Sequence, residues 1–284
     1  MNVILGIVLV IGSVAGGFVL SHGKLAALWQ PYELLIIGGA AFGAFVITNP
    51  ASVLKGVLHQ LPILMKGSPY KKGYYLDSLA LLYDLLSKAR KQGMMSLESD
   101  VEEPEKSPLF GKYPKILGDH HAVEFLTDYL RLMVGGSIKN SFELENLMDV
   151  ELDTHHEEAL QPSAALTRVS DALPGFGIVA AVLGIVITMA SLGGPPAELG
   201  AHVAAALVGT FLGILLAYGF VGPMATLVEH GARDQSQFLK VLKTVLLAAQ
   251  QGYSPQIAVE FGRKAIFTAE RPGFKELEDH VKRK

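Results

Sequence analysis

The sequence contains no cysteine. This absence excludes a disulfide framework, a thiolate metal site and a cysteine nucleophile, and it fits a reducing cellular interior. The sequence also lacks the glycine-rich loops that bind nucleotide phosphates, G-x-x-x-x-G-K-S/T and a G-x-G-x-x-G run after a strand. The net charge of −3 gives no surface for nucleic acid. We therefore predict no enzyme activity, no cofactor and no nucleic-acid partner.

Charge is missing from two long stretches near the end of the sequence. Residues 172–197 and 199–228 contain no Asp, Glu, Lys or Arg. Each stretch is long enough to cross a hydrocarbon core of ~30 Å. Only a short connector around Gly193 and Pro196 joins them, which predicts a tight transmembrane hairpin without a charged residue at membrane depth.

Two further apolar stretches, 3–20 and 34–47, lie at the start of the chain. Half of all residues are hydrophobic and the mean hydropathy is +0.35, yet 18% are charged, so the composition mixes membrane and soluble parts. The basic segment that begins a signal peptide is missing before residue 3, so we interpret the first stretch as a retained helix.

Basic residues near the membrane ends predict the orientation. Lys55 and Lys71 follow the second span and Arg233 follows the fourth, whereas the two short connectors carry only Lys24. The insert and the tail are therefore expected in the cytosol, with both termini inside. The predicted class is an all-α integral membrane protein with four transmembrane helices, a large cytosolic helical insert and a cytosolic helical tail. The predicted division is 1–50, 51–170, 171–228 and 229–284.

The insert and the tail show helix signals rather than strand signals. Apolar periodicity predicts helices over 75–91, 121–134 and 142–160. Arg90 lies in the last turn of the first, where a basic side chain complements the helix dipole, and Gly93 follows it. Ser254 and Pro255 predict a helix start in the tail.

Two histidine pairs, at 120–121 and 155–156, raise the question of a metal site. Adjacent histidines on a helix point about 100° apart, so they chelate poorly. We interpret both pairs as solvated helix surface and predict no metal site.

The spans contain few polar side chains. They are Thr188, Ser191, His202, Thr210 and Tyr218. A hydroxyl such as that of Thr210 either bonds back to the carbonyl one turn earlier or faces a pore or a partner. The residues alone favour the first alternative.

A proline lies near the cytosolic end of each uncharged stretch. Pro174 fits the first turn of a helix, whereas Pro223 should kink or end its helix. Either residue could mark a hinge or a fixed bend.

Ion movement across a membrane usually requires an ionisable group at depth. The spans offer only Glu33, at the outer edge of the second. If the chain forms an ion channel, a second protein must supply the carboxylate.

Several motifs along the whole chain carry a family resemblance. They are RKQG at 90–93, SLE at 96–98, YLR at 129–131, LPGFGIVAA at 173–181, GTFLG at 209–213, LAYG at 216–219, AVEFGRK at 258–264 and ERP at 270–272. With four spans and one large insert, the chain resembles the flagellar stator subunits of the MotA/TolQ/ExbB proton channel family.

The resemblance implies an assembly in the bacterial inner membrane. A pentamer of this chain would surround two copies of a MotB-like, peptidoglycan-anchored partner that supplies an ionisable Asp. Ion flow would turn the ring against its partner, and cytosolic charges would push the rotor protein FliG.

The resemblance also implies roles for residues. Arg90 and Glu98 match the charges that contact the rotor. Pro174 and Pro223 match the prolines that couple ion flow to movement. The channel would be lined by Ala181, Thr210 and Tyr218, with Thr210 near the Asp of the partner. Sodium-driven relatives tend to carry a hydroxyl at the position of Ala181, so protons are favoured.

Two other functions stay open. A TolQ/ExbB-type subunit would transmit proton-motive force to the outer envelope, but such chains typically have three spans with the N-terminus outside. A membrane scaffold without ion conduction is the other alternative.

Overall fold

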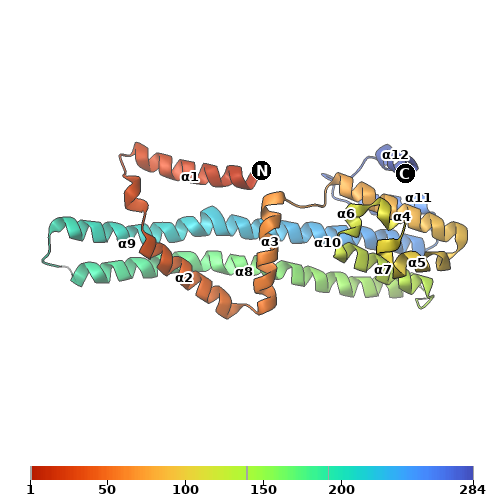
Figure 1. The fold of residues 1–284 in the computed structure, drawn as a ribbon, viewed down its shortest axis with the longest axis horizontal. Coiled ribbons are helices and arrows are strands. Elements are labelled where there is room, and N and C mark those ends of the chain that lie inside the picture. Colours follow the sequence, from red (N-terminus) through yellow and green to blue (C-terminus); the bar gives the residue numbers. More distant parts are fainter. Residues whose placement is uncertain (1, 139, 191, 284) are drawn as a thin grey trace. The chain divides into compact units, whose positions relative to one another are not determined.

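The structure is a computed structural model that describes residues 2–138, 140–190 and 192–283, and the backbone alone for 2, 61–66 and 283. Every regular element in these ranges is a helix, and no strand occurs there (Figure 1). The predicted all-α class is confirmed. Ser191, named above among the polar residues of the spans, lies outside the described residues.

Four helical segments in the described ranges are long and apolar enough to cross a membrane. They are Val3–Leu20, Leu25–Thr48, and apolar windows within Ser141–Ala190 and Pro196–Gln250. They confirm the four predicted spans. The first helix leaves Ile4, Leu5 and Val8 more than half exposed, as expected for side chains that face lipid or another membrane helix.

The chain packs as two compact units. One comprises Met1–Gly67 with Ala159–Gly231, and the other Ser68–Glu158 with Ala232–Lys284. Helices α8 (Ser141–Ala190) and α10 (Gly222–Gln250) each contribute to both units. These units follow packing, whereas the four-part division predicted above follows hydropathy and stays a prediction.

Helix α8 corrects one expectation about helix ends. The helix predicted over 142–160 and the third span form one continuous helix, with Pro162 and Pro174 inside it. Pro174 is therefore not in a first turn. A proline in a helix interior removes one N–H donor, but packed neighbours can satisfy the carbonyls that it frees, so membrane helices tolerate it.

The first unit contains the remaining membrane elements. They are α1 (Asn2–Leu20), η1 (Leu25–Leu28), α2 (Pro31–Thr48), α3 (Ala51–Lys66), α9 (Pro196–Leu216) and a π-helical turn, η5 (Ala217–Val221). Helix α9 returns beside α8 (Figure 1). Val53 and Val57 of α3 are buried with Ala165 of α8.

Glycines allow α8 and α9 to approach closely. A Cβ atom placed on Gly213 would lie 2.7 Å from the carbonyl oxygen of Leu173, and one on Gly177 would lie 3.0 Å from the carbonyl oxygen of Gly209. Because the obstacles are backbone atoms, they cannot move aside, and larger residues would push the two helices apart.

The second unit is a helical bundle with its own core. Its longer helices are α4 (Lys72–Gln92), α7 (His120–Val134), α11 (Pro255–Ala265) and α12 (Phe274–Arg283), together with parts of α8 and α10. Short helical segments connect α4 to α7: η2 (Met94–Leu97), α5 (Glu98–Glu102), η3 (Pro104–Lys106), η4 (Phe110–Lys112) and α6 (Pro114–Leu117). Leu79, Leu82, Phe125 and Phe238 are fully or almost fully buried in its core.

The predicted helix start in the tail is confirmed. Pro255 is the first residue of α11, and the hydroxyl oxygen of Ser254 accepts a hydrogen bond from the backbone N–H of Ile257 at 3.4 Å. This bond satisfies one of the free donors at a helix N-terminus.

Candidate functional site

The residues expected to line a channel lie in the first unit, where α8, α9 and η5 meet. Ala181 and Thr210 are half-buried. A Cβ atom on Gly209 would lie 3.4 Å from the backbone nitrogen of Ala181, and one on Gly177 would lie 3.4 Å from the Cα of Thr210. The two predicted lining residues therefore sit on contacting turns of neighbouring helices. Tyr218, in η5, is 67% exposed.

The hydroxyl of Thr210 behaves differently from that of another threonine in the spans. Thr188 donates to the carbonyl oxygen of Gly184, one turn earlier, at 2.8 Å. Within the described part of the chain, Thr210 makes no such bond. The alternative favoured from the residues alone is therefore wrong for Thr210, and its hydroxyl remains available for an ion or a partner.

Pro223 is the second residue of α10, and Gly222 separates it from the π-helical turn η5. Proline cannot donate the backbone hydrogen bond that a regular helix requires, and local π adjustments can satisfy the groups that it frees. The helix does not end at Pro223, because α10 continues to Gln250. The predicted kink stays a prediction.

Glu33 belongs to this site, although its position in the sequence indicated only the outer edge of a span. The side chain is 7% exposed, and its Oε2 atom has no hydrogen-bond partner among the described residues. A Cβ atom on Gly209 would lie 3.0 Å from that oxygen. The two stretches of the hairpin on either side of Glu198 contain no Asp, Glu, Lys or Arg, but α2 places one carboxyl group directly against α9. Gly209 is the sequence feature that could have indicated this contact, because only a residue without a side chain leaves room for Glu33.

The predicted rotor-contacting charges lie in the second unit. Arg90 is exposed in the last turn of α4, and Glu98 is exposed at the start of α5. Neither forms an ion pair with another described residue, whereas Lys88, one half-turn before Arg90, pairs with buried Asp100 at 2.6 Å. Both charged side chains therefore face solvent, and the Lys88–Asp100 ion pair joins the two helices that carry them.

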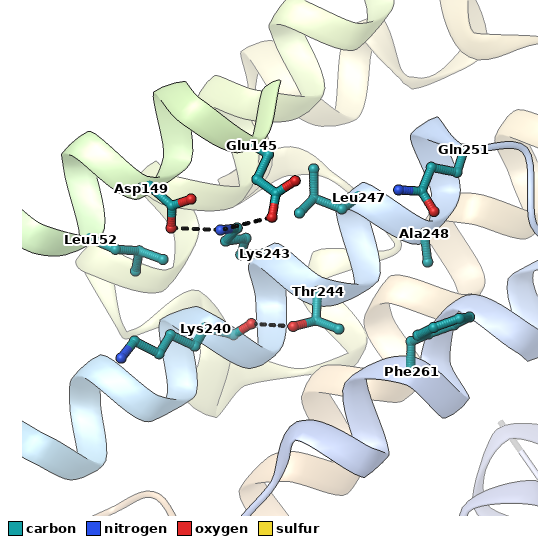
Figure 2. Close-up of a pocket in the computed structure, with 10 residues that line it drawn as sticks. All are labelled: Glu145, Asp149, Leu152, Lys240, Lys243, Thr244, Leu247, Ala248, Gln251 and Phe261. Atoms are coloured by element: carbon teal, nitrogen blue, oxygen red, sulfur yellow. Dashed lines mark hydrogen bonds and ion pairs between the residues drawn. The ribbon is translucent and has the colours of Figure 1, made fainter. Parts of the chain in front are cut away.

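A groove of about 400 Å³ in the second unit is lined by α8, α10 and α11 (Figure 2). The ammonium group of Lys243 lies 2.6 Å from Asp149 and 3.8 Å from Glu145, and Thr244 donates to the carbonyl oxygen of Lys240 at 2.7 Å. The ion pairs of Lys243 therefore join α10 to α8 across this groove.

The histidines of α7 and α8 lie close together. The rings of His121 and His155 meet edge to face with their centroids 5.4 Å apart, and Nδ1 of His155 is buried without a partner among the described residues. Burial, assisted by the nearby charge of His121, lowers the pKa of His155 despite the opposing effect of Glu158 and Asp119. His155 is therefore half-buried, not a solvated surface residue as predicted. In the described ranges no group of three or more His, Asp or Glu side chains could hold a metal ion.

Comparison with known proteins identifies the family of the chain. Residues 4–93 match the model of the motility protein A N-terminal region, and residues 119–240 match that of the MotA/TolQ/ExbB proton channel family. The chain is 51% identical to motility protein A of Salmonella typhimurium over 282 residues, which cover 99% of this chain and 95% of that protein. The chain belongs to the motility protein A family. This confirms the resemblance found in the sequence motifs.

Other family members are similarly close. Motility protein A of Escherichia coli is 50% identical over 99% of this chain and 95% of that protein, and chemotaxis protein LafT of Vibrio parahaemolyticus is 41% identical over 98% and 97%. This member of the motility protein A family is a membrane protein of the flagellar motor stator and is not an enzyme.

Solved structures show the same fold. The Campylobacter jejuni (C. jejuni) MotAB structure matches with a TM-score of 0.79 at 21% identity, covering 96% of this chain and 98% of that one. The flagellar MotAB stator complex of Bacillus subtilis matches with a TM-score of 0.72 at 22% identity, covering 90% and 92%.

Proposed function

We propose that this chain forms, with a MotB-like partner, the proton channel whose ion flow turns the flagellar rotor. The observation that carries the proposal is the contact of α8 and α9 at Ala181 and Thr210. There, glycine packing brings α8 and α9 into contact, and α2 places the carboxyl group of Glu33 against Gly209, the residue before Thr210. The similar solved structures are of MotAB, which supports a partner of the MotB type.

The partner supplies what the hairpin lacks. Residues 172–197 and 199–228 contain no Asp, Glu, Lys or Arg, so they offer walls, hydroxyl groups and the imidazole of His202 but no carboxylate. A partner helix with an Asp beside Thr210 would complete the proton path. The methyl side chain of Ala181 favours protons, because it offers no oxygen ligand to a sodium ion.

Movement would follow from a change of charge on the partner Asp. Pro174 and Pro223 each remove one backbone N–H donor, from α8 and from α10. Bending there costs less than in an uninterrupted helix, so a change in ion occupancy is transmitted most readily at these two residues.

Assembly explains the apolar surface that the first unit leaves uncovered. Ile178, Val182, Val186 and Met189 of α8 are more than half exposed. We propose that a pentamer of this chain around a partner dimer covers them, with membrane lipid on the remaining apolar faces. The assembly would lie in the inner membrane with both chain termini in the cytosol.

Force would reach the rotor through the exposed charges of the second unit. Arg90 and Glu98 are proposed to contact FliG. In this division, 1–50 and 171–228 form the membrane part, 51–170 the rotor-contacting part and 229–284 the cytosolic tail.

The deciding experiment is complementation of a non-motile deletion strain with this chain and its MotB-like partner. Swimming that is independent of sodium supports a proton-driven stator, and the chain without its partner should conduct no ions. Loss of motility despite normal assembly with the partner would contradict the proposal. Capture of a TonB- or TolA-linked protein in place of the MotB-like one would support the energiser of envelope transport.

A further inference from the structure

The hydroxyl of Ser170 lies between the two helix segments that carry the prolines. Ser170 is one turn before Pro174 in α8, its side chain is 3% exposed, and its Oγ donates to the carbonyl oxygen of Ala217 at 3.0 Å. Ala217 is the first residue of the π-helical turn that precedes Pro223. One side chain therefore joins the neighbourhoods of both prolines.

The backbone hydrogen bonds explain why this position matters. In an α-helix each carbonyl accepts from the N–H four residues later. Pro174 has no N–H, so the carbonyl of Ser170 loses its helical donor. In the π turn, the carbonyl of Ala217 accepts instead from the N–H of Gly222, five residues later, and accepts a second hydrogen bond from Ser170. The Ala217 oxygen is thus held from two helices.

Gly222 fits this arrangement and no larger residue does so without movement. A Cβ atom on Gly222 would lie 3.1 Å from the carbonyl oxygen of Ala217 and 3.1 Å from Oγ of Ser170. The glycine leaves the space through which the Ser170 hydroxyl reaches the turn.

We propose that Ser170 is a positioning residue that holds the π turn before Pro223 at a fixed place beside the Pro174 segment of α8. A bend at one proline then displaces the other, because the Ser170–Ala217 hydrogen bond must move with both. The inference rests on the proposed ion-driven function. π turns inside helices are common at functional sites because they shift between hydrogen-bond patterns at small cost.

A second serine of the same helix provides a matched control. Ser163 is also buried, and its Oγ donates to the carbonyl oxygen of Ala225 in α10, again at 3.0 Å. This bond joins α8 to a regular helical turn beyond Pro223. Ser163→Ala and Ser170→Ala therefore remove the same kind of hydrogen bond, but only the second removes it from the π turn.

The experiment measures proton flux per assembled complex in membranes that contain the full chain and its partner. A neutral hydrogen bond of this kind corresponds to about a two- to tenfold change in an equilibrium between two conformations. We expect Ser170→Ala to lower the flux by that factor at unchanged assembly, while Ser163→Ala leaves the flux unchanged. Equal fluxes in the two variants would overturn the proposal.

A double substitution separates positioning from a general loss of packing. Pro223→Ala restores the missing N–H and removes the reason for the π turn. In the Pro223→Ala background, Ser170→Ala should have no further effect on proton flux, because the Ser170–Ala217 hydrogen bond would no longer hold a π turn in place. If Ser170→Ala lowered the proton flux by the same factor in both backgrounds, Ser170 would contribute packing alone and would not position the π turn.

If Ser170→Ala does not assemble, Gly222→Ala perturbs the same hydrogen bond from the other side. It should lower flux by a similar factor, and normal flux would contradict the proposal. The unsubstituted chain with its partner is measured in parallel. Absence of flux there would count against the proposed function, whereas loss of the predicted difference between variants would count against Ser170 alone.

Discussion

Asp100 fixes the segment that carries Glu98 to the helix that carries Arg90. Its carboxylate is 2% exposed and accepts from the ammonium group of Lys88 at 2.6 Å and from the hydroxyl of Ser107 at 2.6 Å. Lys88 belongs to α4 and Asp100 to α5. The spacing of the two charges proposed to contact the rotor, Arg90 and Glu98, therefore depends on a carboxylate that is itself buried.

The expected cost of Asp100→Ala follows from the burial of the two partners. Removing one member of a fully buried ion pair costs ~3–5 kcal/mol, because the other charge is left unpaired. The Lys88 side chain is 28% exposed and can regain water, which places the loss at about 2–3 kcal/mol. A loss of this size corresponds to a fall in the thermal midpoint of about 5–10 °C.

Circular dichroism of the purified chain on heating measures the midpoint, and hydrogen exchange of residues 97–113 locates the loosening. The matched control is Asp128→Ala, which removes an exposed acid from its ion pair with Arg131 and should cost ~0–1 kcal/mol. Swimming should fall in Asp100→Ala, although both rotor-facing charges remain. A midpoint equal to that of the control, with unchanged exchange, would refute this reasoning.

Three other perturbations test the remaining steps. Arg90→Glu should abolish or impair swimming while insertion and assembly persist, since Arg90 is exposed and unpaired; normal motility would remove its rotor role. Thr210→Val keeps the side-chain shape and should lower proton flux without loss of folding, because no described helix carbonyl depends on that hydroxyl; unchanged flux would exclude it from the path. Since the folded-state pKa of His155 lies below its ordinary value of 6.5, its contribution to stability is complete above pH 6.5 and is lost as pH falls below it. The thermal midpoint of the unsubstituted chain should therefore fall between pH 7.5 and pH 5.5, and it should fall less in His155→Gln. The control is His120→Gln, which replaces an exposed histidine. Equal falls in the unsubstituted chain and both variants would show that His155 does not cause the pH dependence.

The long elements could be predicted from the sequence because each follows from a repeated pattern. Uncharged stretches of membrane length located the spans, and apolar periodicity with a basic last turn located the helix that ends near Arg90. The same local rules predicted two separate helices, one over 142–160 and another with Pro174 in its first turn, where the structure has the single helix α8. Proline ends helices in water, but inside packed membrane helices neighbouring groups satisfy the freed carbonyls, and α8 continues.

The contacts of the site could be predicted only in part, because they join residues far apart in the chain. The motifs identified Ala181 and Thr210 as neighbours of a channel. The sequence did not identify Ser170, because the positioning role proposed for it depends on a π turn that begins 47 residues later. No local sequence pattern predicts that turn. His155 was misjudged for the same reason, since its burial depends on the ring of His121 in another helix.

Glu33 and Gly209 show how an uncharged hairpin can still have a carboxyl group at its centre. The close approach of α8 and α9 requires glycines, and at one of them, Gly209, the missing side chain leaves room for both α8 and the carboxyl group of Glu33 from α2. A buried polar atom without a partner costs about 1–3 kcal/mol, and Oε2 of Glu33 has no hydrogen-bond partner among the described residues. On the proposed function the MotB-like partner supplies the acid that carries the proton. We expect the same assembly to offer Glu33 a hydrogen-bond donor, because that would remove the cost of the unpaired oxygen.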